Sequence, residues 1–130
     1  MATIFSKIVN GEIPCYKIAE DEHYFAFLDI NPLQQGHTLV IPKKEIDYLF
    51  DLEDNQLSGI TIFAKKVAKA IQKAVSCKRV GMVVLGLEVP HAHIHLIPIN
   101  DESDVDFSNP RVKLSKEEME AIADKIKSAF

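Results

Sequence analysis

The chain has 130 residues, of which 47% are hydrophobic and 26% charged, and its formal net charge is −4. This length and composition fit one globular domain that buries a sizeable core. The acidic balance argues against a protein that wraps nucleic acid, and no stretch approaches the roughly 20 apolar residues of a membrane span.

The cysteine content and the N-terminus bear on the cellular compartment. Cys15 and Cys77 are far apart and form no CxxC pair, which favours reduced thiols over a disulfide framework. The first residues contain no apolar region of the kind found in secretory signals. We therefore expect a cytoplasmic protein.

The first third of the chain predicts a short helix followed by three strands. Apolar residues recur at helical spacing over residues 3–10, and Asn10-Gly11 is a stop signal. Strands are predicted at residues 13–18, 24–30 and 36–41. Short turns separate them, which favours antiparallel pairing.

The rest of the chain predicts two more helices and two more strands. Apolar residues recur every three or four positions from an N-cap at Asp54 or Asn55 to the neighbourhood of Ser76-Cys77. Strands are expected at residues 80–85 and 89–99, and a capping box at Ser115 predicts a terminal helix over about 115–129.

These elements predict an α+β fold in a single domain, residues 1–130. We expect an antiparallel, meander-like sheet with one long helix packed on it, a short N-terminal helix and an extra C-terminal helix. The core is expected over about residues 3–99, with the remainder as a C-terminal extension.

Three of the five histidines alternate with apolar residues. On a β-strand this spacing places His91, His93 and His95 on one face and turns Ala92 and Ile94 toward a core on the other. Burying three imidazoles for packing alone requires partners for all their ring nitrogens, since each unsatisfied polar group costs about 1–3 kcal/mol. A functional role is therefore favoured.

Two kinds of chemistry suit such a row. Three imidazoles bind zinc and leave a fourth position for water. However, same-face residues lie about 6.6 Å apart along a strand, so converging all three on one ion at about 2.1 Å is awkward. A neutral imidazole is also a nucleophile toward phosphorus, and its neighbours hydrogen-bond phosphate oxygens without distorting the strand. We favour phosphate chemistry without a metal, with zinc as the alternative.

The stretch from His91 to Ile97 resembles the His-φ-His-φ-His-φ-φ motif of the histidine triad (HIT) superfamily, where φ is an apolar residue. Other segments resemble its Hint-like branch in the same order along the chain. They are residues 3–8, 12–14, 27–32 and 36–44. The resemblance covers about residues 3–99 and implies a HIT-like fold.

The resemblance implies a nucleotidyl hydrolase or transferase that needs no cofactor and no metal. His93 would attack the α-phosphate of a nucleoside 5′-phosphoramidate or a related compound, and water would release the monophosphate from a nucleotidyl-histidine intermediate. His95 and His37 would contact the phosphate and the leaving group, and His91 would orient the neighbouring ring.

The resemblance also implies a binding site for a purine nucleotide such as AMP or GMP. Asp29 would bind the ribose hydroxyls. The base would lie in an apolar pocket made of Ile4, Phe5, Ile8, Phe27, Ile30 and Leu39. For Ile8 and Leu39, ordinary core packing explains the residue equally well. A homodimer is implied, formed through the long helix and a strand edge.

One segment departs from the family pattern. Residues 84–90 are shorter than in the Hint-like branch, with Leu85 and Leu87 in place of the Asn and Gln that help to hold phosphate. Glu88 in this segment is expected to be a surface group rather than a general acid. Two alternatives therefore remain open. They are a dinucleoside polyphosphate hydrolase and a weakly catalytic, nucleotide-binding regulatory module.

Overall fold

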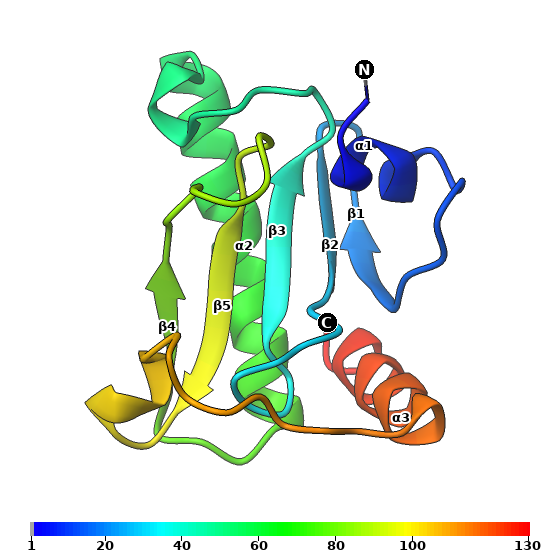
Figure 1. The fold of residues 1–130 in the computed structure, drawn as a ribbon, viewed down its shortest axis with the longest axis vertical. Helices are drawn as coiled ribbons and strands as arrows, with labels where there is room; N and C mark the ends of the chain where they lie inside the picture. Colours follow the sequence, from blue (N-terminus) through cyan, green and yellow to red (C-terminus); the bar gives the residue numbers. More distant parts are fainter. Residues whose placement is uncertain (1) are drawn as a thin grey trace.

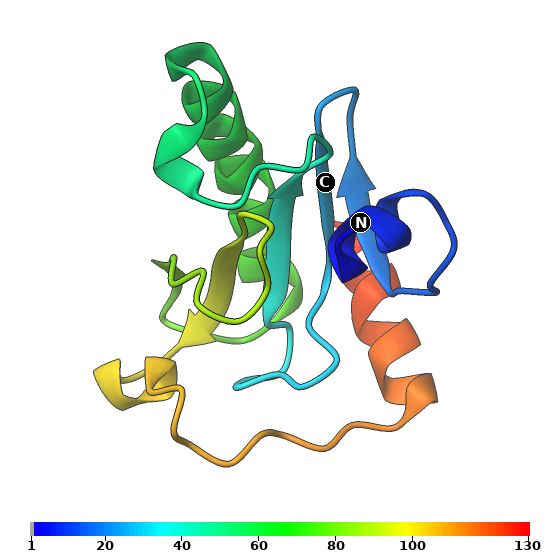
Figure 2. The same ribbon diagram turned by 45° about the horizontal axis from the view of Figure 1, so that its top comes forward.

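A computed structural model describes residues 2–130 and shows a five-stranded sheet with helices on both sides (Figures 1 and 2). Its helices and strands are α1 (Ile4–Val9), β1 (Lys17–Glu20), β2 (Tyr24–Leu28), β3 (Thr38–Pro42), α2 (Asp54–Ala74), β4 (Arg79–Val83), β5 (Ile94–Ile99) and α3 (Lys116–Lys127). Two short 3-10 helices are η1 (Leu49–Asp51) and η2 (Glu102–Val105).

The sheet has the strand order β1-β2-β3-β5-β4, and every neighbouring pair is antiparallel. A short turn connects β1 to β2 and a loop of residues 29–37 connects β2 to β3, and both pairs are antiparallel, so the predicted meander is confirmed for these three strands. The chain then crosses one face of the sheet in α2, and β5 returns between β3 and β4. The predicted α+β class is confirmed, with β4 as an edge strand.

The larger core lies between the sheet and α2, which runs behind the sheet in Figure 1. Alternate residues of β2, namely Tyr24, Ala26 and Leu28, belong to this core together with Ile60 and Val67 of α2. The C-terminal helix α3 packs into the same core through Met119, Ile122, Ala123 and Ile126. The periodicity that predicts both helices thus marks the faces that they bury.

A smaller apolar cluster lies on the opposite face of the sheet. Phe25 and Phe27 alternate with the β2 residues of the larger core, so they point away from α2. They pack with Phe5 and Ile8 of α1, and with Leu39 and Ile41 of β3. This second face, covered only in part by α1, carries the candidate site.

The helix predictions were accurate at most ends. Thr3 caps α1, its side chain accepting a hydrogen bond from the Ser6 backbone N–H. The predicted caps of α2, Asp54 and Asn55, were wrong because the helix begins at Asp54 after Glu53, which makes no side-chain cap.

No helix among residues 2–130 is both long and apolar enough to cross a membrane.

The strands predicted at 13–18, 36–41 and 89–99 all begin later than predicted, the second by two residues and the other two by four or more. The strand predicted at 13–18 begins only at Lys17, because the preceding segment with Pro14 follows the rim of a cavity. The strand predicted at 89–99 begins at Ile94. The backbone N–H of His91 donates to the Val89 carbonyl at 2.8 Å, which bends the chain instead of extending the ladder.

Candidate active site

A cavity of about 560 Å³ lies on the sheet face opposite α2. His93 and His95 line it, together with all seven residues predicted to bind nucleotide: Ile4, Phe5, Ile8, Phe27, Asp29, Ile30 and Leu39. His37 and His91 are fully buried beside the two cavity histidines and do not line the cavity themselves. The predicted residues are therefore brought together in space.

The apolar end of the cavity is continuous with the smaller core cluster. Phe5 lies edge-on to Phe27 at 5.6 Å and to the His93 ring at 5.1 Å between centroids. Ile4 and Ile30 are 49% and 71% exposed, so they form the rim rather than the floor. An apolar ring bound here would lie directly beside His93.

The three histidines of the motif do not lie on one regular strand, and this part of the prediction was wrong. Only His95 lies within β5, while His91 and His93 precede it. The alternation of side chains nevertheless holds, since Ala92 and Ile94 are in the larger core. The rings of His93 and His95 lie 5.1 Å apart on the cavity side.

His91 has a partner for each ring nitrogen. Its Nε2 donates to the Pro42 carbonyl at 2.8 Å, so its Nδ1 accepts from the Thr3 hydroxyl at 2.7 Å. The Thr3 backbone N–H and the Ser6 hydroxyl both donate to Glu45 Oε1, at 2.7 Å each. His91 is thereby fixed between α1 and the end of β3.

The orientation of the His93 ring follows from one backbone contact. Its Nδ1 lies 2.7 Å from the His91 carbonyl oxygen, which only accepts hydrogen bonds. The neutral ring therefore carries its proton on Nδ1 and has a free lone pair on Nε2. Such a nitrogen is a nucleophile.

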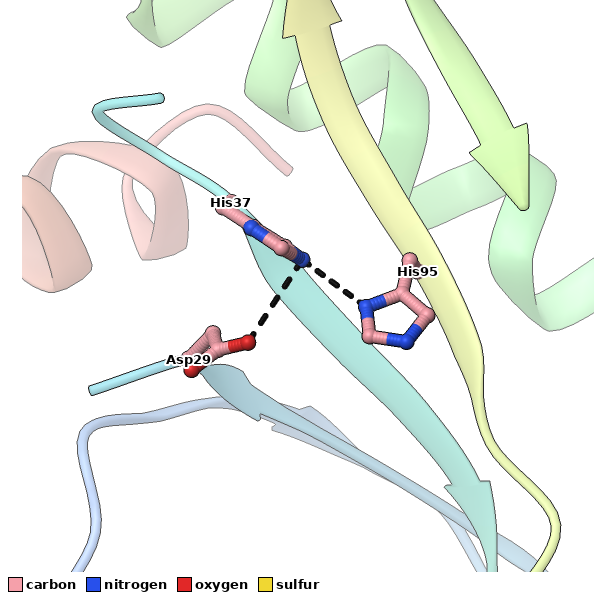
Figure 3. Close-up of side chains that lie close together, drawn as sticks. All are labelled: Asp29, His37 and His95. Carbon is pink, nitrogen blue, oxygen red and sulfur yellow. Dashed lines mark hydrogen bonds and ion pairs between the residues drawn. The ribbon is translucent and has the colours of Figure 1, made fainter. Parts of the chain in front are cut away.

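His37 and His95 form a hydrogen-bonded pair (Figure 3). The Leu33 backbone N–H donates to His37 Nδ1 at 3.0 Å, so the neutral His37 ring carries its proton on Nε2. That proton is donated to His95 Nδ1 at 2.9 Å, which leaves the His95 proton on Nε2. His95 is therefore a hydrogen-bond donor at its far nitrogen.

Burial keeps these rings neutral. Desolvation lowers the pKa of His37 to about 3 and the pKa of His95 to about 4. Burial also lowers the pKa of His91. At neutral pH the hydrogen-bond directions given above for His37, His91 and His95 therefore apply.

Asp29 lies at the start of the loop after β2. Its Oδ1 accepts from the Asn31 backbone N–H at 2.8 Å, and burial raises its pKa. Its Oδ2 is 3.6 Å from His37 Nε2, too long for a hydrogen bond, and because His37 is neutral this contact is not an ion pair.

Asp29, His37 and His95 offer three potential metal-ligand atoms within 4.8 Å of one another (Figure 3). A metal requires a lone pair on each ligand nitrogen. The Leu33 N–H fixes the proton of His37 on Nε2, the nitrogen that faces the other two groups. This donor set fits a hydrogen-bonded pair and does not fit a metal centre.

The aromatic and the basic residue at the far side of His95 were not among the predicted site residues. Phe107 lies edge-on to His95 at 4.9 Å between ring centroids, and the guanidinium carbon of Arg111 lies 5.4 Å from the Phe107 ring. Both line the cavity. They belong to a polar segment without periodicity, beyond the stretch of the resemblance, so only their residue types could have drawn attention to them.

The segment that departs from the family pattern also borders the cavity, through Leu85, Gly86, Leu87, Glu88 and Val89. Leu87 is 91% exposed. Glu88 is exposed, in agreement with the prediction of a surface group, and it lies at the mouth of the cavity.

Known proteins share the fold and much of the sequence. The HIT domain family model matches residues 10–102. Adenosine 5′-monophosphoramidase hnt1 of Schizosaccharomyces pombe is 39% identical over 131 residues, 98% of this chain and 98% of that protein.

Solved structures agree over nearly the whole chain. A Hit-like protein from Bartonella henselae superposes with a TM-score of 0.84 at 33% identity, covering 98% of this chain and 96% of that one. A zinc-bound histidine triad family protein from Mycobacterium smegmatis has a TM-score of 0.85 at 27% identity, covering 99% and 93%.

An antiparallel α+β fold with a buried histidine cluster beside an apolar cavity thus defines the class. The chain belongs to the HIT family, as the histidine motif predicted. Family membership supports a nucleotide hydrolase as the general class of activity.

Proposed function

We propose that this protein hydrolyses nucleoside 5′-phosphoramidates or related nucleotidyl compounds at the α-phosphate and releases a nucleoside monophosphate. The observation that carries the proposal is the geometry of His93. Its Nδ1 is held by a backbone carbonyl and its ring lines the cavity, so the neutral ring has its lone pair on Nε2.

The first step forms a covalent intermediate. The lone pair of His93 Nε2 attacks phosphorus, the P–N bond breaks, and its electron pair leaves with the amine, which takes a proton from solvent. The His91 carbonyl stabilises the positive imidazole ring by accepting its Nδ1–H.

The second step regenerates the enzyme. Water attacks phosphorus, the bond from phosphorus to Nε2 breaks, and the proton lost by water returns to solvent. His95 stabilises the charge on the phosphate oxygens in both steps by donating its Nε2–H, and His37 holds the proton there. No proton has to leave a neutral histidine.

The cavity also supports the proposed nucleotide. The apolar end beside Phe5, Phe27 and Leu39 suits a purine ring, and Asp29 at the adjoining edge suits the two ribose hydroxyls. AMP and GMP derivatives are therefore the proposed ligands. The relative named adenosine 5′-monophosphoramidase supports adenosine 5′-phosphoramidate as the first substrate to test.

The test is turnover of adenosine 5′-phosphoramidate to AMP by the purified protein. We expect turnover that EDTA leaves unchanged, loss of turnover in His93→Ala, and normal turnover in His23→Ala, at an exposed histidine outside the cavity. Full activity in His93→Ala would contradict the proposed role of His93, and inhibition by EDTA would contradict the proposed independence from metal.

Leu85 and Leu87 line the cavity where the family pattern has polar residues that help to hold phosphate. This difference favours a second candidate function, a nucleotide-binding module with weak catalysis. Such a protein would bind AMP saturably without turning over any phosphoramidate. A parallel assay on diadenosine polyphosphates distinguishes the third candidate, a dinucleoside polyphosphate hydrolase.

We also propose that the protein forms a homodimer in the cytoplasm. The edge strand β4 exposes Met82 with 51% of its surface accessible, and α2 exposes Ile62 with 56%. Unpaired edge strands with apolar side chains favour pairing with a second chain. Unpaired thiols at Cys15 and Cys77 suit a reducing compartment.

A further inference from the structure

The segment between η2 and α3 is held against the loop that follows β2 (Figure 1). The Val112 backbone N–H donates to the Pro32 carbonyl at 2.9 Å, and Arg111 Nη1 donates to the Asn31 carbonyl at 3.3 Å. Arg111 Nη2 also donates to the Phe107 carbonyl at 3.4 Å. Phe107 and Arg111 thus occupy defined positions at the cavity.

Arg111 supplies the only permanent positive charge among the described residues that line the cavity. The other ionisable groups there are the carboxyls of Asp29 and Glu88, the two histidines and the Cys15 thiol. Within residues 2–130, no carboxylate oxygen lies within 4.0 Å of the Arg111 guanidinium, so its charge is available to a ligand.

A phosphate ester that enters this cavity needs a cation. The cavity that receives its negative charge is also lined by the carboxyls of Asp29 and Glu88. A neutral His95 donates a hydrogen bond to the phosphate but does not offset its charge. A guanidinium matches phosphate oxygens with two parallel N–H donors and, unlike a histidine, stays charged at every relevant pH.

We propose that Arg111 binds the phosphate group of the nucleotide beside His95. Phe107 supports this role because its ring is near both residues, with its centroid 4.9 Å from that of the His95 ring and 5.4 Å from the guanidinium carbon. In this chain Arg111 thereby supplies phosphate contacts in place of the polar side chains missing at Leu85 and Leu87. The inference rests on the proposed function, since it requires a nucleotide in this cavity.

The experiment is a pair of calorimetric titrations, with AMP and with uncharged adenosine. The proteins are the wild type, Arg111→Gln, Arg111→Lys and the control Lys113→Gln, which removes an exposed cation two residues away and outside the cavity. We expect Arg111→Gln to weaken AMP binding by about tenfold or more, as for other hydrogen bonds to charged groups. Adenosine binding should not change.

The two control variants sharpen the result. Arg111→Lys keeps the charge without the planar donor pair and should lie between the wild type and Arg111→Gln, whereas Lys113→Gln should match the wild type. Unchanged AMP binding in Arg111→Gln, or an equal loss of AMP and adenosine, would overturn the assignment of Arg111.

The outcome separates this inference from the proposed function. A wild type that binds AMP and hydrolyses the phosphoramidate, together with an Arg111→Gln variant that does both equally well, refutes only the role of Arg111. A wild type that neither binds AMP nor hydrolyses the phosphoramidate refutes the proposed function itself.

Discussion

At the scale of single residues, backbone groups set the protonation pattern of the site. The Leu33 N–H only donates and the His91 carbonyl only accepts, and neither titrates. They direct the proton of His37 toward His95 and the lone pair of His93 away from its own backbone. Burial lowers the pKa of His37 and of His95, which keeps these two rings neutral.

Thr3 carries two roles that a single substitution removes. Its hydroxyl caps α1 and donates to His91 Nδ1. We expect Thr3→Val to lower the free energy of unfolding by about 1–3 kcal/mol, as a cap and a buried hydrogen bond are both lost. We also expect a lower kcat with little change in KM, since His91 carries the carbonyl that orients His93.

Thr3→Ser is the matched control, because it keeps the hydroxyl and should retain both stability and kcat. Urea unfolding and steady-state kinetics on the two variants make the comparison. A Thr3→Val enzyme with wild-type kcat would show that His91 holds its position without this hydrogen bond.

The lowered pKa values of the buried histidines predict that the folded protein loses stability in acid. His37 and His95 bind protons in the unfolded chain near pH 6.5 but in the folded protein only near pH 3 and pH 4. Between these values the unfolded state holds more protons, so stability falls as pH falls. Each group contributes a slope that approaches about 1.4 kcal/mol per pH unit.

The measurement is the free energy of unfolding from pH 6.5 to pH 5, to which the raised pKa of Asp29 contributes in the opposite direction. His37→Asn should reduce the slope by about one proton's contribution. His23→Asn, at an exposed histidine, is the control. A slope unchanged in His37→Asn would mean that His37 is not neutral in the fold.

The residues of the site differ in how readily the sequence alone predicts them. The triad appears in the sequence because its residues are contiguous and alternate with apolar ones. Asp29 and His37 lie far from the triad in the chain and were found only through the family resemblance. Phe107 and Arg111 have neither periodicity nor a matching motif, since their position depends on how the C-terminal segment crosses the molecule.

At the scale of elements, the turn before β3 depends on a glycine. Gly36 has φ of +92°, and a Cβ there would lie 2.9 Å from Val75 Cγ2. We expect Gly36→Ala to destabilise the protein by about 1–3 kcal/mol and to lower activity, because the next residue is His37.

Gly11→Ala is the control for this substitution. Gly11 has a similar φ of +80°, but nothing lies within 4 Å of its would-be Cβ. The difference in melting temperature between the two variants measures the contact with Val75 apart from backbone strain. Equal effects would show that the contact is relieved by a small movement.

Helices were predicted better than strands, for physical reasons. The 21 residues of α2 repeat one apolar face many times, so tertiary context has little power to change the outcome. The ends of β1 and β5 depend on where neighbouring strands and the cavity rim lie. The Ala92 N–H, for example, pairs with the Ile46 carbonyl at 2.6 Å instead of with β3.

At the scale of the whole molecule, the two faces of the sheet have different roles, one in stability and one in forming the candidate site. The face toward α2 and α3 holds the larger core, while the opposite face combines the smaller cluster with the cavity. The edge strand β4 remains unpaired on its outer side among residues 2–130.

The proposed dimer gives a prediction at this scale. Met82→Lys places a charge on the exposed β4 edge and should convert the protein to a species near the 14.6 kDa of one chain. Light scattering on a size-exclusion column provides the mass, with Phe130→Lys as the control at another exposed apolar residue. A wild-type protein that already has the mass of one chain would refute the dimer.

The most direct test of the proposed mechanism is to trap the covalent intermediate. The protein is mixed with adenosine 5′-phosphoramidate, quenched within one turnover and analysed by peptide mass spectrometry. The proposed mechanism predicts an adenylyl group on His93 that is absent from His93→Ala. Turnover without any adduct, or an adduct on another residue, would contradict it.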